Sequence, residues 1–276
     1  MSTCSSSSAR PLKIGIIGFG NFAQFLSKTM IKQGHSLRAT SRSDHSQLCK
    51  QLGIPFYRDM SAFLESDNEV VLICTSILSL SQVVKPMPFN SLKRPTLFVD
   101  VLSVKEFPRD LLLQVLPENM DLLCTHPMFG PESGKHGWQD LSFMYDRVRI
   151  RDEALCYSFI HIFSSEGCRM LEMSCEEHDK LAARTQFLTH TIGRILSEMD
   201  VEPTPLDTKG FQKLFEVVGA TTPPTWLTLM LNKNLIRQLQ TTLSLLFFSY
   251  ITKSSTLILS TSKTTLSHLT LYDKIE

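Results

Sequence analysis

The fold is decided by the stretch KIGIIGFGNFA, from Lys13 to Ala23. Its first five residues are typical of a buried strand, and the next apolar residues, up to Lys32, recur at helical spacing. Between strand and helix lies the pattern GxGxxA, in which Gly18 permits a tight turn, Gly20 lets the backbone approach a pyrophosphate, and Ala23 allows close packing. The helix start supplies N–H donors for phosphate. Glycine turns also arise for steric reasons alone, but this context predicts a dinucleotide site with Gly18, Gly20, Asn21 and Phe22.

Strands and helices alternate over roughly the first 125 residues. This alternation predicts an α/β fold, a Rossmann-type doubly wound parallel sheet with helices on both faces. The expected strands are Lys13–Ile17, Ser36–Ser41, Ile54–Tyr57, Val70–Cys74, Thr96–Val101, Asp121–Cys124 and Cys168–Ser174. The expected helices are Phe22–Lys32, His45–Leu52, Met60–Glu65, a segment near Leu80, Glu106–Gln114, Ala154–Ser165 and Cys175–Met199.

We expect four segments along the chain. Residues 1–11 are an N-terminal extension without order, and residues 12–174 form the nucleotide-binding domain. Residues 175–240 form a smaller helical domain for substrate binding and dimerisation, with an atypical sequence after residue 218. Residues 241–276 are rich in Ser, Thr and Leu and show no sustained helical periodicity. We therefore predict little order in that tail.

Composition excludes several classes of function. The formal net charge is +1, without a clustered basic face, which argues against nucleic-acid binding. The seven cysteines have no paired metal-ligand spacing, so we expect reduced thiols and no metal site. The longest late apolar run, Leu243–Ile251, is far shorter than a membrane span, and no secretory signal precedes the first strand. These features favour a cytoplasmic protein whose partners are small molecules or other proteins.

The end of the second predicted strand indicates which dinucleotide binds. NAD sites usually place an acidic residue there for the ribose diol, whereas this chain has Ser41, Arg42 and Ser43. Hydroxyl groups and a guanidinium suit a 2′-phosphate, which favours NADP. The alternative is that Arg42 is a solvated surface residue and that Asp44 supplies the acid.

Three polar clusters follow predicted strands, at the edge where open α/β sheets build their sites. They are Thr75 with Ser76, Ser103 with its neighbours up to Lys105, and His126. His126 begins HPMFGPESGK, a stretch too rich in Pro and Gly for helix or regular strand, and its prolines predict a stiff loop. A histidine held in this way suits a general base acting on a substrate hydroxyl, with Ser103 positioning either group. A histidine after a strand can equally be structural.

The long helix predicted from Cys175 carries a polar face. Its residues Gln186, Thr189, His190 and Arg194 recur at spacings of three and four, so they share one side of the helix. If this face packs against the crevice, His190 and Arg194 become groups for a substrate carboxylate. A face of this kind is otherwise simply solvated.

Six motifs together resemble the plant arogenate/prephenate dehydrogenases of tyrosine biosynthesis. They are GIIGFGNFAQFLSKTMIKQGH, TSRSD, FVDVLSVKE, THPMFGPESGKHGW, CEEHDKLAARTQFLTHTIGR and TPLDTKGF, and the likeness extends from about Leu12 to about Val218. The resemblance implies NADP-dependent oxidative decarboxylation of arogenate to tyrosine, or of prephenate to 4-hydroxyphenylpyruvate. It implies that His126 is the catalytic histidine, that Ser103 is its hydrogen-bonding partner, and that His190 and Arg194 lie near the substrate. It also implies a homodimer.

The chain departs from this family after Val218. Where the family continues with a helix that shapes the substrate pocket and the dimer core, this chain reads GATTPPTWLTLMLNKN. One alternative is therefore a catalytically impaired NADP-binding protein with an incomplete substrate domain. A second is a reductase of similar build that acts on a hydroxyacid or imino acid. Because plastid members carry transit peptides, a plastid location is the alternative to the cytoplasm.

Overall fold

The computed structural model describes residues 9–199 and 202–220. Its centre is one sheet of eight strands in the order β3-β2-β1-β4-β5-β6-β7-β8. Strands β1 to β6 run parallel, β7 is antiparallel to β6, and β8 is parallel to β7. The strands are β1 (Lys13–Ile17), β2 (Ser36–Thr40), β3 (Phe56–Tyr57), β4 (Val70–Ile73), β5 (Leu97–Asp100), β6 (Asp121–Pro127), β7 (Ser142–Arg149) and β8 (Arg169–Glu172). This confirms the predicted Rossmann-type sheet, whose first six strands have the order 3-2-1-4-5-6.

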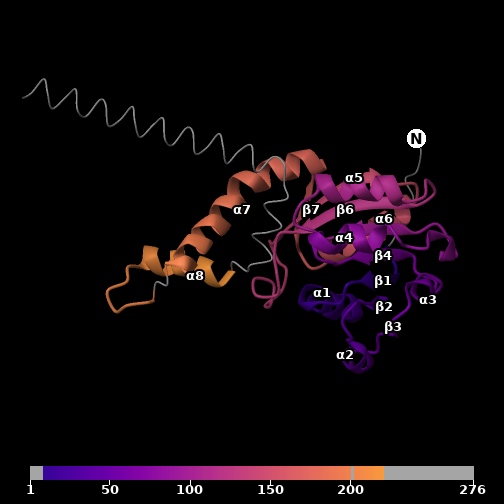
Figure 1. Ribbon diagram of the computed structural model, residues 1–276, viewed down its shortest axis with the longest axis horizontal. Helices are drawn as coiled ribbons and strands as arrows, with labels where there is room; N and C mark the ends of the chain where they lie inside the picture. The colour runs from indigo at the N-terminus through magenta and orange to yellow at the C-terminus, as the bar shows by residue number, and fades with distance from the viewer. Residues whose placement is uncertain (1–8, 200–201, 221–276) are drawn as a thin grey trace, which may run out of the picture.

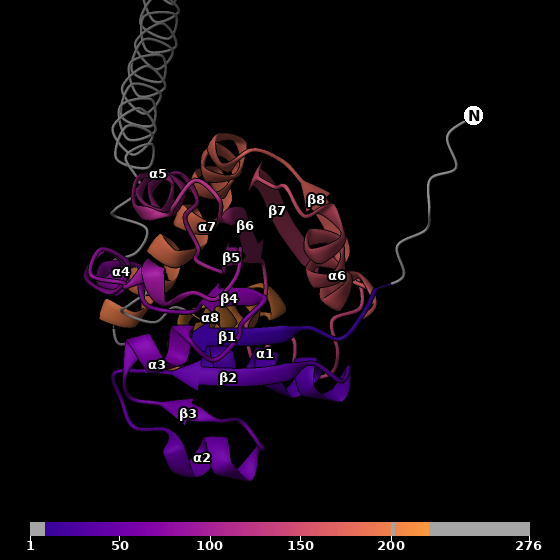
Figure 2. The same ribbon diagram turned by 90° about the vertical axis from the view of Figure 1, so that its right-hand side faces the viewer.

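Helices cover both faces of the sheet and bury two separate apolar cores. One core packs strand residues such as Ile14 and Val99 against α1, α2 and α6, and the other packs Val71 and Phe98 against α3, α4 and α5. Figure 2 shows α4 and α5 on one side of the stacked strands and α6 on the other. The helices are α1 (Asn21–Lys32), α2 (Ser46–Gln51), α3 (Met60–Leu64), α4 (Ile77–Val84), α5 (Glu106–Val115), α6 (Glu153–Ser164), α7 (Cys175–Glu198) and α8 (Lys209–Ala220), with a 3₁₀ turn, η1, at Phe89–Ser91.

The turn between β1 and α1 has the geometry that its sequence predicts. Gly18 has a φ of +89°, which is unfavourable for any residue with a Cβ. A Cβ built on Gly18 would also lie 2.8 Å from the carbonyl oxygen of Cys74, which follows β4. The chain therefore passes the end of β4 too closely for any residue but glycine at position 18.

The structure corrects the prediction for His126 and for the segment after its loop. His126 and Pro127 are not loop residues but the last two residues of β6, where they pair with Met144 and Phe143 of β7. Proline is tolerated there because it ends the strand, where a missing N–H does least harm. We did not predict β7 as a strand, because its second half carries charged residues that hide the apolar alternation.

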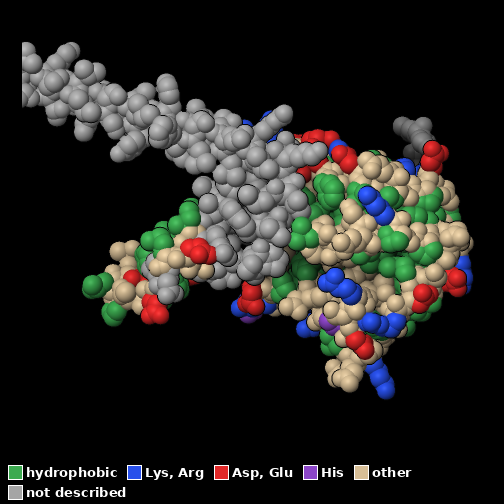
Figure 3. All heavy atoms as spheres, viewed as in Figure 1, with side chains coloured by type: hydrophobic (Ala, Val, Ile, Leu, Met, Phe, Trp, Pro, Cys, Tyr) green, Lys and Arg blue, Asp and Glu red, His purple; other side chains and the backbone are tan. Residues whose placement is uncertain are grey.

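The helices α7 and α8 form an arm that leaves the sheet. Figure 1 shows α7 starting beside α5 and then running away from the sheet, with α8 packed along its far part. Several large apolar side chains on this arm are exposed, among them Ile195, Met199 and Leu206, and Figure 3 shows apolar atoms on its surface. The division of the chain into domains stays a prediction, and residues 221–276, with the tail predicted there, lie outside the described residues.

Candidate active site

A cleft of about 700 Å³ opens where β1, β2 and β4 end. Parallel strands place their carboxyl ends at one edge of the sheet, so the polar residues that follow them converge there. Seven of the nine residues predicted for the cofactor line this cleft, and the other two, Asn21 and Phe22, are the first two residues of α1. The cleft is lined by Ile17, Gly18, Phe19, Gly20, Thr40, Ser41, Arg42, Ser43, His45, Arg58, Met60, Cys74, Thr75, Ser76, Ser79, Gln82, Val83, Pro86 and Met87. Phe22, although at the same edge, does not line it.

The glycine turn fits the diphosphate of a dinucleotide. No side chain in the part of the chain that the structure describes caps the first turn of α1, so its N–H groups remain available to a bound anion. A Cβ on Gly20 would meet nothing within 4 Å, so the backbone there faces open space. The hydroxyl of Thr75 is buried without a hydrogen-bond partner among the described residues. An orphaned polar group of this kind in a cleft suits a ligand that supplies the missing bond.

A second guanidinium, which the sequence analysis did not identify, is bonded to the loop after β2. The side chain of Arg58, which follows β3, donates to the carbonyl oxygens of Arg42 at 3.0 Å and Ser41 at 3.4 Å. The carboxylate of Asp44 instead accepts the backbone N–H of Ser46 at 2.9 Å, at the start of α2, and this bond lowers the pKa of Asp44. Asp44 does not line the cleft. This end of the cleft is therefore rich in cations and hydroxyls.

His126 is buried at the carboxyl end of β6, with 7% of its surface exposed. Its Nδ1 lies 2.9 Å from Nε2 of His178, in the first turns of α7. Within the described residues its Nε2 has no hydrogen-bond partner. The following loop is anchored on α1, because Phe25 packs against Phe129 and Trp138 with ring centres 6.3 and 5.6 Å apart. Packing, in addition to the prolines, therefore holds this loop.

A buried polar network extends from His126 through the first turns of α7. Nδ1 of His178 lies 2.8 Å from Oδ1 of Asp179. The carboxylate of Asp179 accepts the backbone N–H groups of Lys105 and Glu106, at 2.8 and 3.0 Å, and so caps the start of α5. Ser174 caps α7 itself, since its hydroxyl accepts the N–H of Glu177. This arrangement joins the ends of β5 and β6 to the start of α7.

Burial sets the protonation state of His126. It lowers the pKa of His126 well below the usual 6.5, and the nearby His178 and Lys105 act in the same direction. A buried imidazole resists taking a second proton because charge is poorly solvated there. His126 is therefore neutral at neutral pH, as a general base must be.

Of the remaining predicted site residues, the structure describes the side chains of Ser103 and Thr189 only. Ser103 lies half-buried in the β5–α5 connection, but it makes no hydrogen bond to His126 within the described residues, where His178 is the partner. Thr189 is exposed on α7, with its hydroxyl bonded to the carbonyl of Thr185. Gln186, His190 and Arg194 belong to α7 by backbone position, but their side chains lie outside the described residues.

Sequence reasoning did not assign a role to His178, Asp179 or Arg58. Acidic residues in the first turns of a helix are usually exposed and favoured by its dipole, whereas Asp179 is 2% exposed. The adjacent His-Asp pair in the first turns of a helix was the available signal. The local sequence spacing does not show that this His-Asp pair contacts the ends of β5 and β6.

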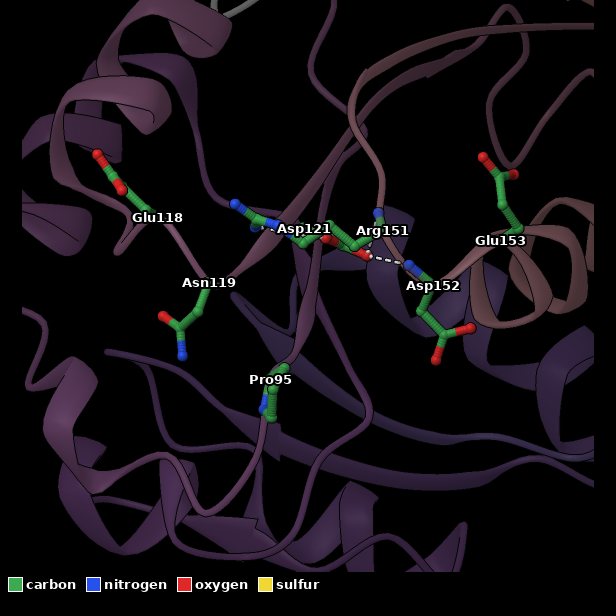
Figure 4. Close-up of a pocket in the computed structure, with 7 residues that line it drawn as sticks. All are labelled: Pro95, Glu118, Asn119, Asp121, Arg151, Asp152 and Glu153. Atoms are coloured by element: carbon green, nitrogen blue, oxygen red, sulfur yellow. Dashed lines mark hydrogen bonds and ion pairs between the residues drawn. The ribbon is translucent and has the colours of Figure 1, made fainter.

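A second cavity, of about 620 Å³, lies at the opposite, amino-terminal edge of the strands. Figure 4 shows its carboxylates spread apart rather than converging. Asp121 accepts the backbone N–H groups of Arg151 and Asp152, which ties β6 to the start of α6. Asp152 caps α6 by accepting the N–H of Leu155. These acids therefore have structural roles.

Three further observations concern the described residues only. They contain no group of three or more His, Cys, Asp or Glu side chains that could hold a metal ion. No helix among them is long and apolar enough to cross a membrane. Six described cysteines are free thiols, and among these only Cys124 lies in a strand, although the predicted strands also included Cys74 and Cys168.

Comparison with known proteins agrees with this geometry. Residues 22–148 match the family model described as prephenate dehydrogenase, nucleotide-binding domain. The chain is 57% identical over 214 residues to arogenate dehydrogenase 1, chloroplastic, of Arabidopsis thaliana, a match covering 76% of this chain and 33% of that protein. It is 51% identical over 237 residues to arogenate dehydrogenase 2, chloroplastic, of the same plant, covering 83% and 66%. The chain thus spans a third of one relative and about two thirds of the other.

A solved structure shares the fold. Prephenate dehydrogenase from A. aeolicus, in complex with hydroxyphenyl propionate and NAD+, superposes with a TM-score of 0.67 at 15% identity, covering 96% of this chain and 99% of that one. The nucleotide-binding domain, the glycine turn and the identities above lead to one conclusion: the chain belongs to the arogenate/prephenate dehydrogenase family.

Proposed function

We propose that this protein is an arogenate dehydrogenase, which converts arogenate to tyrosine by oxidative decarboxylation. The observation that carries the proposal is the placement of His126, neutral and buried, at the same sheet edge as the glycine turn. The identity of 57% and 51% to two proteins named arogenate dehydrogenase favours arogenate over prephenate as the substrate. A hydroxyacid or imino-acid reductase would leave that likeness unexplained.

The chemistry needs one base and one hydride acceptor. NADP, held by the glycine turn and the residues after β2, would supply the acceptor for the hydride that leaves the ring carbon bearing the hydroxyl. Nε2 of His126, which has no partner among the described residues, takes the hydroxyl proton as that C–H bond breaks. Loss of the ring carboxylate as CO₂ sends its electron pair into the ring, and His126 then returns the proton to the phenolate oxygen. The products, tyrosine, CO₂ and reduced cofactor, balance the atoms of substrate and cofactor.

NADP is proposed over NAD because of the loop after β2. Arg42, Ser41 and Ser43 line the cleft, and Arg58 adds a guanidinium beside them. Two guanidiniums and two hydroxyls suit a phosphate, whereas Asp44, the acid that a free ribose diol would need, is bonded at the start of α2.

The remaining features of the proposal depend on the relatives. His190 and Arg194 are proposed to bind the substrate carboxylates with Gln186 and Thr189, and Ser103 to contact the substrate hydroxyl or His126. Both Arabidopsis relatives are named chloroplastic, which favours a plastid location over the cytoplasm. Assembly as a homodimer stays a prediction.

The test is paired kinetics on the full chain. Purified protein with NADP and arogenate should form NADPH, CO₂ and tyrosine in equal amounts, and arogenate should be used more efficiently than prephenate. Tight NADP binding without turnover of either substrate would contradict the proposal and favour the alternative, a catalytically impaired NADP-binding protein. That alternative is motivated by the departure from the family sequence after Val218.

A further inference from the structure

Three buried side chains form a line that ends at His126. Asp179 Oδ1 lies 2.8 Å from His178 Nδ1, and His178 Nε2 lies 2.9 Å from His126 Nδ1. The three residues are 2%, 3% and 7% exposed. The two imidazoles meet nearly edge to face, with ring planes 68° apart, which points a nitrogen of one ring at the other.

The hydrogen bonds that Asp179 accepts determine which nitrogen of each histidine ring carries a proton. Asp179 already accepts two backbone N–H groups, from Lys105 and Glu106, and an ionised carboxylate can only accept. His178 Nδ1 must therefore carry a proton and donate it to Asp179. In a neutral His178 the other nitrogen, Nε2, then has a lone pair and accepts from His126.

The same reasoning fixes the tautomer of His126. Since its Nδ1 donates to His178, a neutral His126 has its proton on Nδ1 and a free lone pair on Nε2. With His178 neutral and donating to Asp179, the opposite tautomer of His126 would place a lone pair on its Nδ1 against the lone pair on His178 Nε2. Only the first arrangement leaves His126 able to accept a proton from a substrate.

We propose that His178, held by Asp179, is a positioning residue that fixes His126 as the Nδ1–H tautomer, so that Nε2 accepts the proton of the substrate hydroxyl. The inference deepens the proposed function and rests on it. Neither His178 nor Asp179 touches the reacting atoms in this account, because both act through His126. Their effect is to have the correct nitrogen unprotonated before the substrate binds.

Rigid surroundings keep the line in place. The start of α7 is fixed by the Ser174 cap and by Cys175, whose N–H donates to Asp146 of β7 at 2.8 Å. Two buried charged groups act on the pair: Asp179 contacts His178, and the charge of Lys105 acts on His126. Since Asp179 also caps α5, changing it alters folding as well as tautomer. The decisive variants are therefore at His178.

The first test compares two substitutions of His178 in the full chain. His178→Phe keeps a ring but removes the acceptor for His126, so kcat should fall roughly 100-fold, while the arogenate KM and the NADP Kd change less than about twofold. His178→Gln can accept from His126 and donate to Asp179, so it should recover about tenfold of that loss. His136→Gln, on the exposed loop, is the matched control.

A merely structural role would give a different pattern. KM, Kd and the melting temperature would then shift together with kcat, and Gln would be no better than Phe. That pattern, or turnover of His178→Phe within about threefold of the unchanged protein, would overturn the inference.

The second test determines the tautomer of His126 by NMR in the absence of substrate. Long-range ¹H–¹⁵N spectra of the histidine rings distinguish the two tautomers, and His126 is assigned by the signal that disappears in His126→Asn. We expect Nδ1–H for His126 in the unchanged protein and a mixture in His178→Phe. An Nε2–H tautomer in the unchanged protein would overturn the inference. Because this measurement needs no substrate, it separates failure of the inference from failure of the proposed function.

Discussion

The ammonium of Lys105 donates a hydrogen bond of 2.6 Å to the backbone carbonyl of Thr125, the residue before His126. Lys105 also forms an ion pair with Asp100, at the end of β5, and both side chains are fully buried. The hydroxyl of Thr125 donates to the backbone carbonyl of Asp100 at 2.6 Å. One buried ion pair therefore fixes the ends of two neighbouring strands, including the strand that carries His126.

Breaking this pair from one side should be costly. Lys105→Met leaves the Asp100 carboxylate buried without its cation, so we expect the free energy of unfolding to fall by about 3–5 kcal/mol. Urea denaturation of the variant and of Lys135→Met, a change at an exposed loop lysine, measures the difference. Adding Asp100→Asn to Lys105→Met should restore part of the stability, because the uncompensated charge is then gone. A single variant as stable as Lys135→Met would contradict this assignment.

Gly18 should tolerate substitution less well than another glycine of positive φ. Gly18→Ala combines the strain of a φ of +89° with a contact of 2.8 Å to the Cys74 carbonyl, whereas Gly53, at +69°, has nothing within 4 Å. We expect Gly53→Ala to cost about 1–2 kcal/mol of strain alone, and Gly18→Ala to cost more and to weaken NADP binding. Equal unfolding free energies for the two variants would show that the close approach to β4 is unimportant.

The sequence predicted the first half of the fold well because its signals are local. The glycine turn lies between an apolar strand and an amphipathic helix, and β1 occupies the predicted Lys13–Ile17. β7 was missed because Asp146, Arg147 and Arg149 interrupt its alternation, although Phe143 and Met144 are buried in it. β7 is held in the sheet by its pairing with β6, which does not depend on a regular alternation of apolar residues in its sequence.

Part of the candidate site could likewise be predicted from local sequence signals, and part of it could not. The meeting of most of the predicted cofactor residues at one cleft was predictable, because these residues follow strands and parallel strands bring their ends to one edge. The partner of His126 was not predictable, because His178 is 52 residues away in sequence and lies on a helix whose start is placed by contacts to two other elements. A role for Ser103 as that partner stays a prediction.

Arg42 should determine the preference for NADP over NAD. Removing its guanidinium in Arg42→Ala should raise the NADP Kd at least about tenfold, the equivalent of about 1.4 kcal/mol, and leave the NAD Kd nearly unchanged. Arg58→Ala should raise the NADP Kd less, since Arg58 also bonds the loop backbone. Fluorescence titration gives both constants, with Arg151→Ala, at the other edge of the sheet, as the control. Equal effects on NADP and NAD would contradict a role in 2′-phosphate binding.

Buried histidines should make stability depend on pH. Burial lowers the pKa of His126 well below 6.5, and burial lowers that of His35 as well. Below about pH 6.5 the unfolded chain binds protons that the folded chain does not, so the free energy of unfolding falls as the pH decreases, by up to about 1.4 kcal/mol per pH unit for each histidine. Urea denaturation between about pH 7 and pH 5 measures the slope. His126→Asn should reduce this slope; a slope unaffected by His126→Asn would contradict a neutral, buried imidazole.

The most direct measurement of the central claim, that His126 is the base of an arogenate dehydrogenase, is the rate of NADPH formation from arogenate by the full chain and by His126→Asn. Asparagine lacks the basic nitrogen but is similarly polar, so NADP should still bind with an unchanged Kd. We expect the kcat of His126→Asn to be lower than that of the unchanged protein by roughly 10³-fold or more. Turnover of the variant within about tenfold of the unchanged protein, with NADP bound equally well, would contradict it.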